Sequence, residues 1–341
     1  MKNLINLPSP ALLCLPLIFS VFCLSIPQPS AAQQWPLQKQ FRQSQSIFNP
    51  AAVNTDYLLY EYNATFQASY RTQWLSYPET PRTYHLSGEY LTSTRSNFEI
   101  LTGANLMQDR TGPFGFTSIT GRIGATFTRD PYLGLFSAAI HVGWAQYRID
   151  VSRIDWSDPG DPNIPINNST VHAPDLTLGF FYSKRLSGGF FDEDNIYAGF
   201  SIPQLMNIKN RLPTLEGNIQ YQHQPHYFLS GGWFHFLNEE AYIEVASWLK
   251  YTKGAPFNLD LSFRLQPLRT LWVGTGFNTN GLLHLEGGVN IPGLFMENAG
   301  MRLGYSFDYN LSALGLSLGP SHEFTLGIFL DTYAQGFNPR F

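Results

Sequence analysis

Apolar and polar residues alternate along many segments of this chain. In residues 258–266 and 301–310 every second side chain is apolar or aromatic. A period of two is typical of strands that have one apolar and one polar face. The same pattern recurs along the chain and predicts about 14 strands. We place them at 61–75, 83–93, 97–107, 115–128, 133–149, 174–184, 194–203, 224–236, 240–252, 256–266, 270–279, 282–291, 300–310 and 321–331.

A soluble β-sandwich and an outer-membrane barrel share this alternation, and strand length favours the barrel. Spanning a bilayer takes about 9–11 tilted residues, whereas strands of globular proteins usually run about 5–6. Most of the predicted segments have ten residues or more. Aromatic residues such as Trp74, Trp144 and Tyr251 lie near strand ends, which is typical of membrane-interface girdles. We therefore predict an all-β fold, a transmembrane antiparallel β-barrel over residues 61–341.

The polar face of the predicted strands carries ionisable residues. On the wall of a barrel these side chains would face the lumen, where water or opposite charges can solvate them. The residues predicted to face the lumen are Arg122, Glu244, Lys250, Asp260, Arg264, His284, Glu286, Arg302 and Asp308.

Composition narrows the class of protein. Only 13% of the residues are charged, about half the usual fraction, and 15% are aromatic. A disordered chain would be rich in charge and poor in aromatics. The net charge of −4 and the lack of a basic run argue against nucleic acid as a partner.

The N-terminus is typical of an exported protein. Lys2 precedes a mainly apolar segment over residues 11–26, and the small residues Ser30 and Ala32 mark a cleavage site. We predict a signal peptide over residues 1–32 and, after its cleavage, a place in the cell outer membrane among outer-membrane lipids. Residues 33–60 begin mostly polar and without a period, so we predict a periplasmic lead-in there.

An even number of strands with both termini in the periplasm places the long connections at 150–173 and 204–223 outside the cell. The first of these contains the apolar residues Trp156, Ile164 and Ile166 among acidic ones. Apolar side chains with a polar rim are typical of docking surfaces, so these three residues form a candidate partner-docking loop; a protective lid is the alternative interpretation.

Several segments, in order along the chain, carry a resemblance to a known family. They are Phe48-Asn49-Pro50-Ala51, Tyr70-Arg71-Thr72-Gln73-Trp74, Asp109-Arg110-Thr111-Gly112-Pro113 and, in the last strand, Ser321-His322-Glu323 followed by Leu326-Gly327. Together they resemble the PorP/SprF family, outer-membrane proteins of the type IX secretion system of the Bacteroidetes.

The resemblance implies a non-enzymatic role. Members of the family support export of large secreted proteins or hold them at the cell surface, and in gliding members the exported partner is a motility adhesin. The implied partners are periplasmic lipoprotein and ring components of the secretion machine, and the C-terminal domain of a secreted cargo protein.

Candidate catalytic and metal-binding sites are weak, and we predict no catalytic residue, no metal and no cofactor. His223 and His226 flank Pro225 without an evident third ligand, and residues 155–161 are acidic but lack the order of a calcium-binding EF-hand loop. Ser321, His322 and Glu323 are neighbours on one strand, where adjacent side chains point to opposite faces. The alternative function is an outer-membrane channel or transporter of hydrophobic substrates, which a barrel of this size could also serve.

Overall fold

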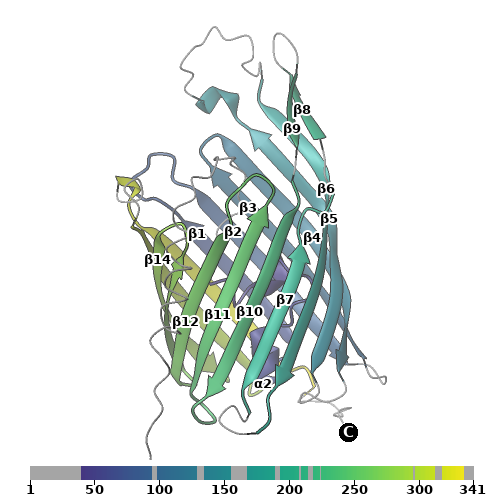
Figure 1. Ribbon diagram of the computed structural model, residues 1–341, viewed down its shortest axis with the longest axis vertical. Helices are drawn as coiled ribbons and strands as arrows, with labels where there is room; N and C mark the ends of the chain where they lie inside the picture. Colours follow the sequence, from purple (N-terminus) through teal and green to yellow (C-terminus); the bar gives the residue numbers. More distant parts are fainter. Residues whose placement is uncertain are drawn as a thin grey trace, which may run out of the picture.

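The computed structural model describes residues 40–93, 98–128, 134–154, 167–188, 193–206, 209–213, 218–222, 224–294, 296–311 and 317–333. In this part of the chain, fourteen strands form one closed antiparallel barrel (Figure 1). The predicted fold class and the predicted strand number are therefore confirmed.

Neighbours along the chain are neighbours in the barrel, and β1 pairs with β16 to close it. The barrel strands are β1 (Ala64–Thr72), β2 (Arg82–Ser93), β3 (Phe98–Thr111), β4 (Phe114–Thr128), β5 (Leu135–Ile149), β6 (Ser169–Arg185), β7 (Asn195–Ile202), β10 (His226–Phe236), β11 (Tyr242–Thr252), β12 (Asn258–Leu268), β13 (Leu271–Asn278), β14 (Leu282–Pro292), β15 (Ala299–Asn310) and β16 (Ser321–Leu330). Between β7 and β10, β8 (Lys209–Pro213) and β9 (Asn218–Gln222) form a separate two-stranded sheet that the alternation did not predict.

The alternation of side chains assigns one face of each strand to lipid. On β12, Leu261 and Phe263 are 48% and 43% exposed, whereas Asp260 and Ser262 are 1% and 4% exposed. Large apolar residues are exposed in the same way on most other strands. The outer surface is thus an apolar belt, and the polar residues of the wall point inward.

The wall is taller on one side. Strands β3 to β6 have 14, 15, 15 and 17 residues, more than the 9–11 that a bilayer needs. They rise at the end where β8 and β9 lie (Figure 1). The connections after β5 and after β7 both leave at this end, and β1 begins and β16 ends at the other. This is the arrangement that an extracellular and a periplasmic side would require.

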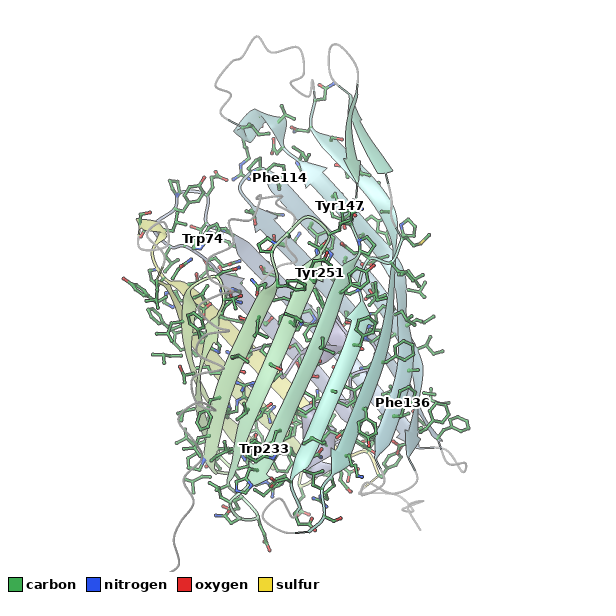
Figure 2. All side chains as sticks on the ribbon, viewed as in Figure 1. Trp74, Phe114, Phe136, Tyr147, Trp233 and Tyr251 are labelled. Carbon is green, nitrogen blue, oxygen red and sulfur yellow. The ribbon has the colours of Figure 1, made fainter. Side chains whose placement is uncertain are left out.

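Aromatic residues mark both rims. Trp74, Phe114, Tyr147 and Tyr251 lie toward the tall end, and Phe136 and Trp233 toward the opposite end (Figure 2). Such rows are typical of the two membrane–water interfaces. At the tall rim, Arg153 of the short helix η2 (Val151–Arg153) donates a hydrogen bond to Glu79, which lowers the pKa of that carboxyl.

Among the residues that the structure describes, no helix is both long and apolar enough to cross a membrane. The two helices near the start of the described chain are short: η1 (Gln45–Ile47) and α2 (Thr55–Tyr60).

The assignment of faces can be tested on β12 with one substitution at two adjacent positions. Phe263→Asp places a carboxylate against lipid, where a charge costs on the order of 2 kcal/mol. Ser262→Asp places the same group in the lumen, two residues from Arg264 on the same face. We expect Phe263→Asp to lower the yield of folded barrel, measured by heat-modifiable gel migration of outer membranes, and Ser262→Asp to retain it. Equal yields from the two variants would contradict the assignment.

Candidate functional site in the barrel lumen

Residues 40–61 lie inside the barrel, and we name them the plug segment. Their hydrogen bonds and ion pairs reach strands on all sides of the wall, among them β1, β2, β4, β6, β11, β14, β15 and β16. In Figure 1 the purple helix α2 is visible within the lower half of the barrel. This differs from the expected periplasmic lead-in over 33–60: the part of that segment that the structure describes lies within the barrel, because its polar side chains find partners on the wall.

The plug segment is compact because it turns repeatedly. Backbone hydrogen bonds from Gln43 to Gln40 and from Ser44 to Phe41 make the first turns. Asn54 caps α2 by accepting a hydrogen bond from the backbone N–H of Asp56 at 2.9 Å. Glu61 ends the helix in the left-handed conformation, with φ of +62°, and the chain then enters β1. The cap and the reversal fix where the segment joins the wall.

Arg42 belongs to a buried cluster of four charges. Its guanidinium pairs with Glu286 of β14 and lies 3.6 Å from Glu244 of β11. Arg264 of β12 approaches the same Glu286 carboxylate at 3.6 Å. Two arginines thus face two glutamates, and one of the four charges comes from the plug segment. A buried charge without its counterion is costly, so this arrangement fixes the plug in place.

Asp56 makes the second ionic anchor. Its carboxylate accepts hydrogen bonds from both terminal nitrogens of Arg302, at 3.1 and 2.5 Å. The Nε of Arg302 donates to Asn290 at 2.8 Å, which holds the guanidinium flat between the two acceptors. Bidentate pairs of this kind are strong and directional.

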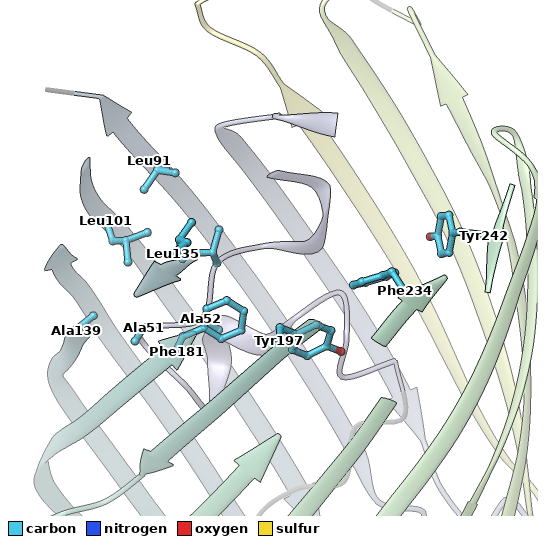
Figure 3. Close-up of a cluster of buried hydrophobic side chains, with 11 residues drawn as sticks. Ala51, Ala52, Leu91, Leu101, Leu135, Ala139, Phe181, Tyr197, Phe234 and Tyr242 are labelled. Atoms are coloured by element: carbon cyan, nitrogen blue, oxygen red, sulfur yellow. The ribbon is translucent and has the colours of Figure 1, made fainter. Parts of the chain in front are cut away.

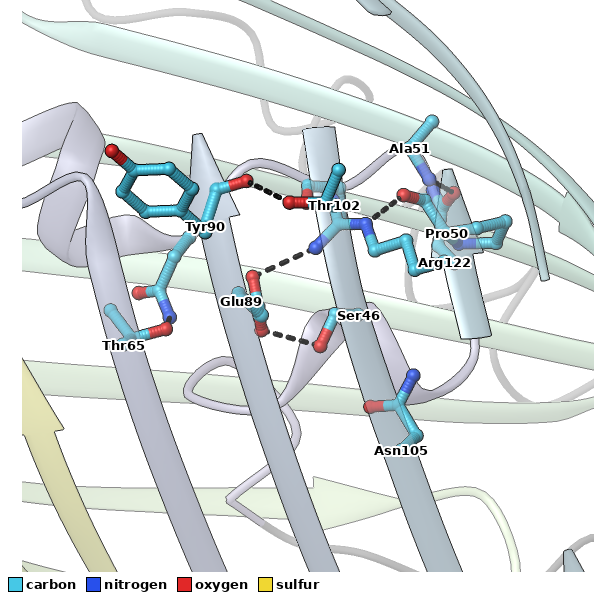
Figure 4. Close-up of polar contacts among 12 residues, drawn as sticks. Ser46, Pro50, Ala51, Thr65, Glu89, Tyr90, Thr102, Asn105 and Arg122 are labelled. Carbon is cyan, nitrogen blue, oxygen red and sulfur yellow. Dashed lines mark hydrogen bonds and ion pairs between the residues drawn. The ribbon is translucent and has the colours of Figure 1, made fainter. Parts of the chain in front are cut away.

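Arg122 binds the backbone of the plug segment. It donates to the carbonyl oxygens of Pro50 and Ala52 and, at 2.9 Å, to Glu89 of β2, which also accepts from Ser46 (Figure 4). The arginine therefore neutralises a wall carboxylate and satisfies two carbonyl groups that would otherwise be buried without partners.

Apolar contacts complete the fit. Phe48 stacks on Trp248 of β11 with ring centroids 4.3 Å apart, and Phe41 lies 5.2 Å from the same ring. On the other side of the segment, Ala51 and Ala52 share a buried cluster with side chains from the wall, among them Phe181 and Phe234 (Figure 3).

Arg71 joins the first and last strands of the barrel. Its guanidinium pairs with Asp308 of β15 and with Glu323 of β16, the latter at 3.2 Å. Beside it, the backbone N–H of Trp74 donates to the Ser321 hydroxyl at 3.2 Å. Glu323 also accepts from the backbone N–H of Gln40, so the seam of the barrel and the plug segment meet at one carboxylate.

A family model described as type IX secretion system membrane protein PorP/SprF matches residues 30–328. The chain belongs to this family.

Solved outer-membrane barrels share the fold. A deletion mutant of the monoaromatic hydrocarbon channel TodX is 10% identical with a TM-score of 0.53, covering 83% of this chain and 93% of that one. A Pseudomonas aeruginosa FadL homologue is 11% identical with a TM-score of 0.50, covering 85% and 94%. A search of curated proteins finds no significant match. At these identities the likeness to the solved structures concerns the fold alone.

Three of the four segments that resemble PorP/SprF proteins lie in the plug segment or at the seam of the barrel; the other, Asp109–Pro113, lies at the turn between β3 and β4. Phe48-Asn49-Pro50-Ala51 forms the centre of the plug segment, where the Asn49 carboxamide donates to the carbonyl of Phe180 at 3.0 Å and accepts from the backbone N–H of Ala51. The Arg71 of the second segment meets the Ser321-His322-Glu323 segment at the seam. The resemblance therefore lies mostly in residues that close the barrel and fill it.

All nine residues predicted to face the lumen are buried and lie on strands of the wall. Five contact the plug segment or its charge cluster: Arg122, Glu244, Arg264, Glu286 and Arg302. The other four have different surroundings. Lys250 pairs with Asp260 and lies over the Trp248 ring. Asp308 pairs with Arg71, and His284 is fully buried on β14.

Sequence reasoning missed the partners of these residues. Arg42 and Asp56 lie in a segment without a period, and Arg71, Glu89 and Glu323 were not selected although two of them lie in the family-like segments. The predicted docking residues Trp156, Ile164 and Ile166 lie outside the described residues. Within the described ranges, no group of three or more His, Cys, Asp or Glu side chains is arranged to hold a metal ion.

The buried arginine at the seam can be tested against an exposed one. Arg71→Met removes the cation from two buried carboxylates, and breaking a buried pair in this way costs about 3–5 kcal/mol. Arg82→Met changes an exposed arginine one strand away and serves as the control. We expect urea unfolding in detergent to show a large loss of stability for Arg71→Met and little change for Arg82→Met. A stability of Arg71→Met equal to that of the control would refute a structural role for the seam.

Proposed function

We propose that this protein is a non-enzymatic outer-membrane component of the type IX secretion system that supports export or surface anchoring of large secreted proteins, such as gliding adhesins. The observation that carries the proposal is the family match over residues 30–328. The closed barrel with an apolar outer belt supports a place in the outer membrane after cleavage of residues 1–32. Periplasmic lipoprotein or ring components and the C-terminal domain of a cargo are the proposed partners.

A structural role also agrees with what the charged residues do. In the part of the chain that the structure describes, Arg71, Arg264 and Arg302 each pair with a buried carboxylate of the wall or of the plug segment. His322 bonds to the Tyr305 hydroxyl at 2.7 Å, whereas the neighbouring Glu323 pairs with Arg71 in the lumen. The two side chains therefore do not converge on a reaction centre.

The alternative function, an outer-membrane channel or hydrophobic-substrate transporter, rests on fold similarity alone. The TodX channel variant shares the barrel at 10% identity, which transfers no substrate. Within the described residues, the lumen holds the plug segment and several buried ion pairs. We therefore favour the secretion role.

The secretion role can be tested by purifying the tagged protein from outer membranes and identifying what accompanies it. We expect periplasmic components of the secretion machine and the C-terminal domain of a secreted protein. A tagged outer-membrane barrel of unrelated function from the same cells serves as the control. Recovery of the protein alone, from membranes in which the machine is intact, would contradict the proposal.

We further propose that the loop containing Trp156, Ile164 and Ile166 helps to hold the cargo. Deleting residues 156–166 removes all three side chains and spares the pairing of β5 with β6, which extends from Leu135–Ser183 to Ile149–Ser169. We expect an unchanged level of folded barrel and a lower surface display of the cargo, measured by labelling of whole cells. Replacing Lys253–Ala255 between β11 and β12 with Gly-Ser-Gly is the control. Normal display with the loop deleted would exclude it as the docking site.

A further inference from the structure

The lumen wall is shaped to receive the plug segment. Gly179 of β6 and Gly199 of β7 face inward beside Asn49. A Cβ atom at Gly179 would collide with the Asn49 carboxamide and would lie 2.7 Å from the Pro50 ring, and one at Gly199 would lie 2.7 Å from the Asn49 carboxamide. On β15, a Cβ at Gly304 would lie 2.5 Å from the Gln40 side chain. At each of these three glycines an added side chain would meet the plug segment; at Gly304 it would also meet Thr325 of the wall, and at Gly199 also Ser230.

The charges of the wall are complementary to those of the plug segment. Without it, Glu244 and Glu286 would share Arg264, and Arg302 would face the neutral amide of Asn290. Arg42 brings a positive charge to the two glutamates and Asp56 a negative charge to Arg302. Arg42 and Asp56 of the plug segment therefore each supply a counterion that the described wall residues do not provide in sufficient number. Complementarity of this kind is what fixes the orientation of a specifically bound segment.

The fit leaves little space for solvent. Residues 40–53 are buried without interruption, although half of them are polar. The segment crosses the lumen, because its partners lie on β16 and β14 on one side and on β4 and β6 on the other. The cavity beside it, between α2 and β1 to β4, holds about 20 Å³, room for about one water molecule.

We propose that the plug segment is a resident seal, so that the intact barrel passes neither ions nor a polypeptide chain. A secreted protein that uses this barrel then does not travel through its lumen and must be held at its surface. This inference goes beyond the proposed secretion role and does not depend on it, because it concerns the pore of the barrel alone.

Conductance of the purified, full-length protein in planar lipid bilayers tests the seal. We expect no current steps from the wild-type protein in potassium chloride. Arg42→Glu would place a third carboxylate beside Glu244 and Glu286, and Gly179→Leu would put a side chain where Asn49 and Pro50 lie. Both changes act against the plug from different sides, one by charge and one by shape. We expect each to produce discrete current steps while the barrel keeps its heat-modifiable migration.

Two matched controls separate the plug from the wall. Arg110→Glu makes the same charge reversal at an exposed position of β3, and Gly88→Leu makes the same enlargement on β2, where an added Cβ meets no atom within 4 Å. Both should fold and stay silent. If Arg42→Glu fails to fold, Arg42→Gln removes the charge at similar size and takes its place.

The proposal is overturned if the wild-type protein conducts as strongly as the plug variants. It is equally overturned if the folded charge and shape variants are both silent, or if the controls conduct as they do. Neither conductance nor its absence decides the secretion role, since that role is measured by cargo display and by the partners that copurify.

Discussion

The neutralisation of charge inside the barrel is the constraint on which the rest of the structure depends. Arg71, Arg122, Arg264 and Arg302 all point into the lumen and are buried there, so each needs an anionic or carbonyl partner. Some of these partners lie on neighbouring strands, such as Glu323 for Arg71. Others come only from the plug segment, such as Asp56 for Arg302. The wall and the plug segment therefore neutralise each other's buried charges.

Closure of the sheet uses the same chemistry. Strands β1 and β16 are far apart in the chain, and their pairing leaves no open edge in the barrel. At the seam the Arg71 guanidinium touches carboxylates from β15 and β16, and Glu323 continues to the backbone of Gln40. The residues that register the last strand thus also fix the start of the described plug. The carboxylate of Glu323 therefore contributes both to closing the barrel and to holding the plug segment.

The sequence predicts the wall well because each strand carries its own signal. In β12 the alternation of Leu259, Leu261, Phe263 and Leu265 with polar residues is sufficient to assign both the strand and its faces. The alternation of apolar and polar residues is lost where neither face of a strand meets lipid. The first residues of β6, 169–173, rise above the belt and lack a lipid-facing apolar row, so the predicted strand begins at 174 instead.

The plug segment could not be predicted in the same way. A polar stretch such as Gln43-Ser44-Gln45-Ser46 is usually solvated, and its burial depends on partners that lie far along the chain. Ser44 bonds to Gln67 and Ser46 to Glu89, but the partner of Arg42, Glu286, lies on β14 near the other end of the chain. A periodic pattern carries no information about such contacts. The family-like Phe48-Asn49-Pro50-Ala51 was the signal available, and it indicated a family without indicating a place in the fold.

The wall of this barrel follows general requirements of a lipid-facing sheet, whereas the residues that face its lumen fit the plug segment. The hydrocarbon channel variant and this chain share strands and closure at 10% identity, since any lipid-facing sheet needs the same alternation and the same paired edges. The residues that fill the lumen do not meet lipid, so neither the alternation nor the pairing of edges constrains them. Here three glycines and two unbalanced charge groups of the wall are explained by one segment of the same chain, because each fits an atom or a charge of that segment. The wall residues of the lumen are therefore best understood as a binding site whose ligand is the plug segment itself.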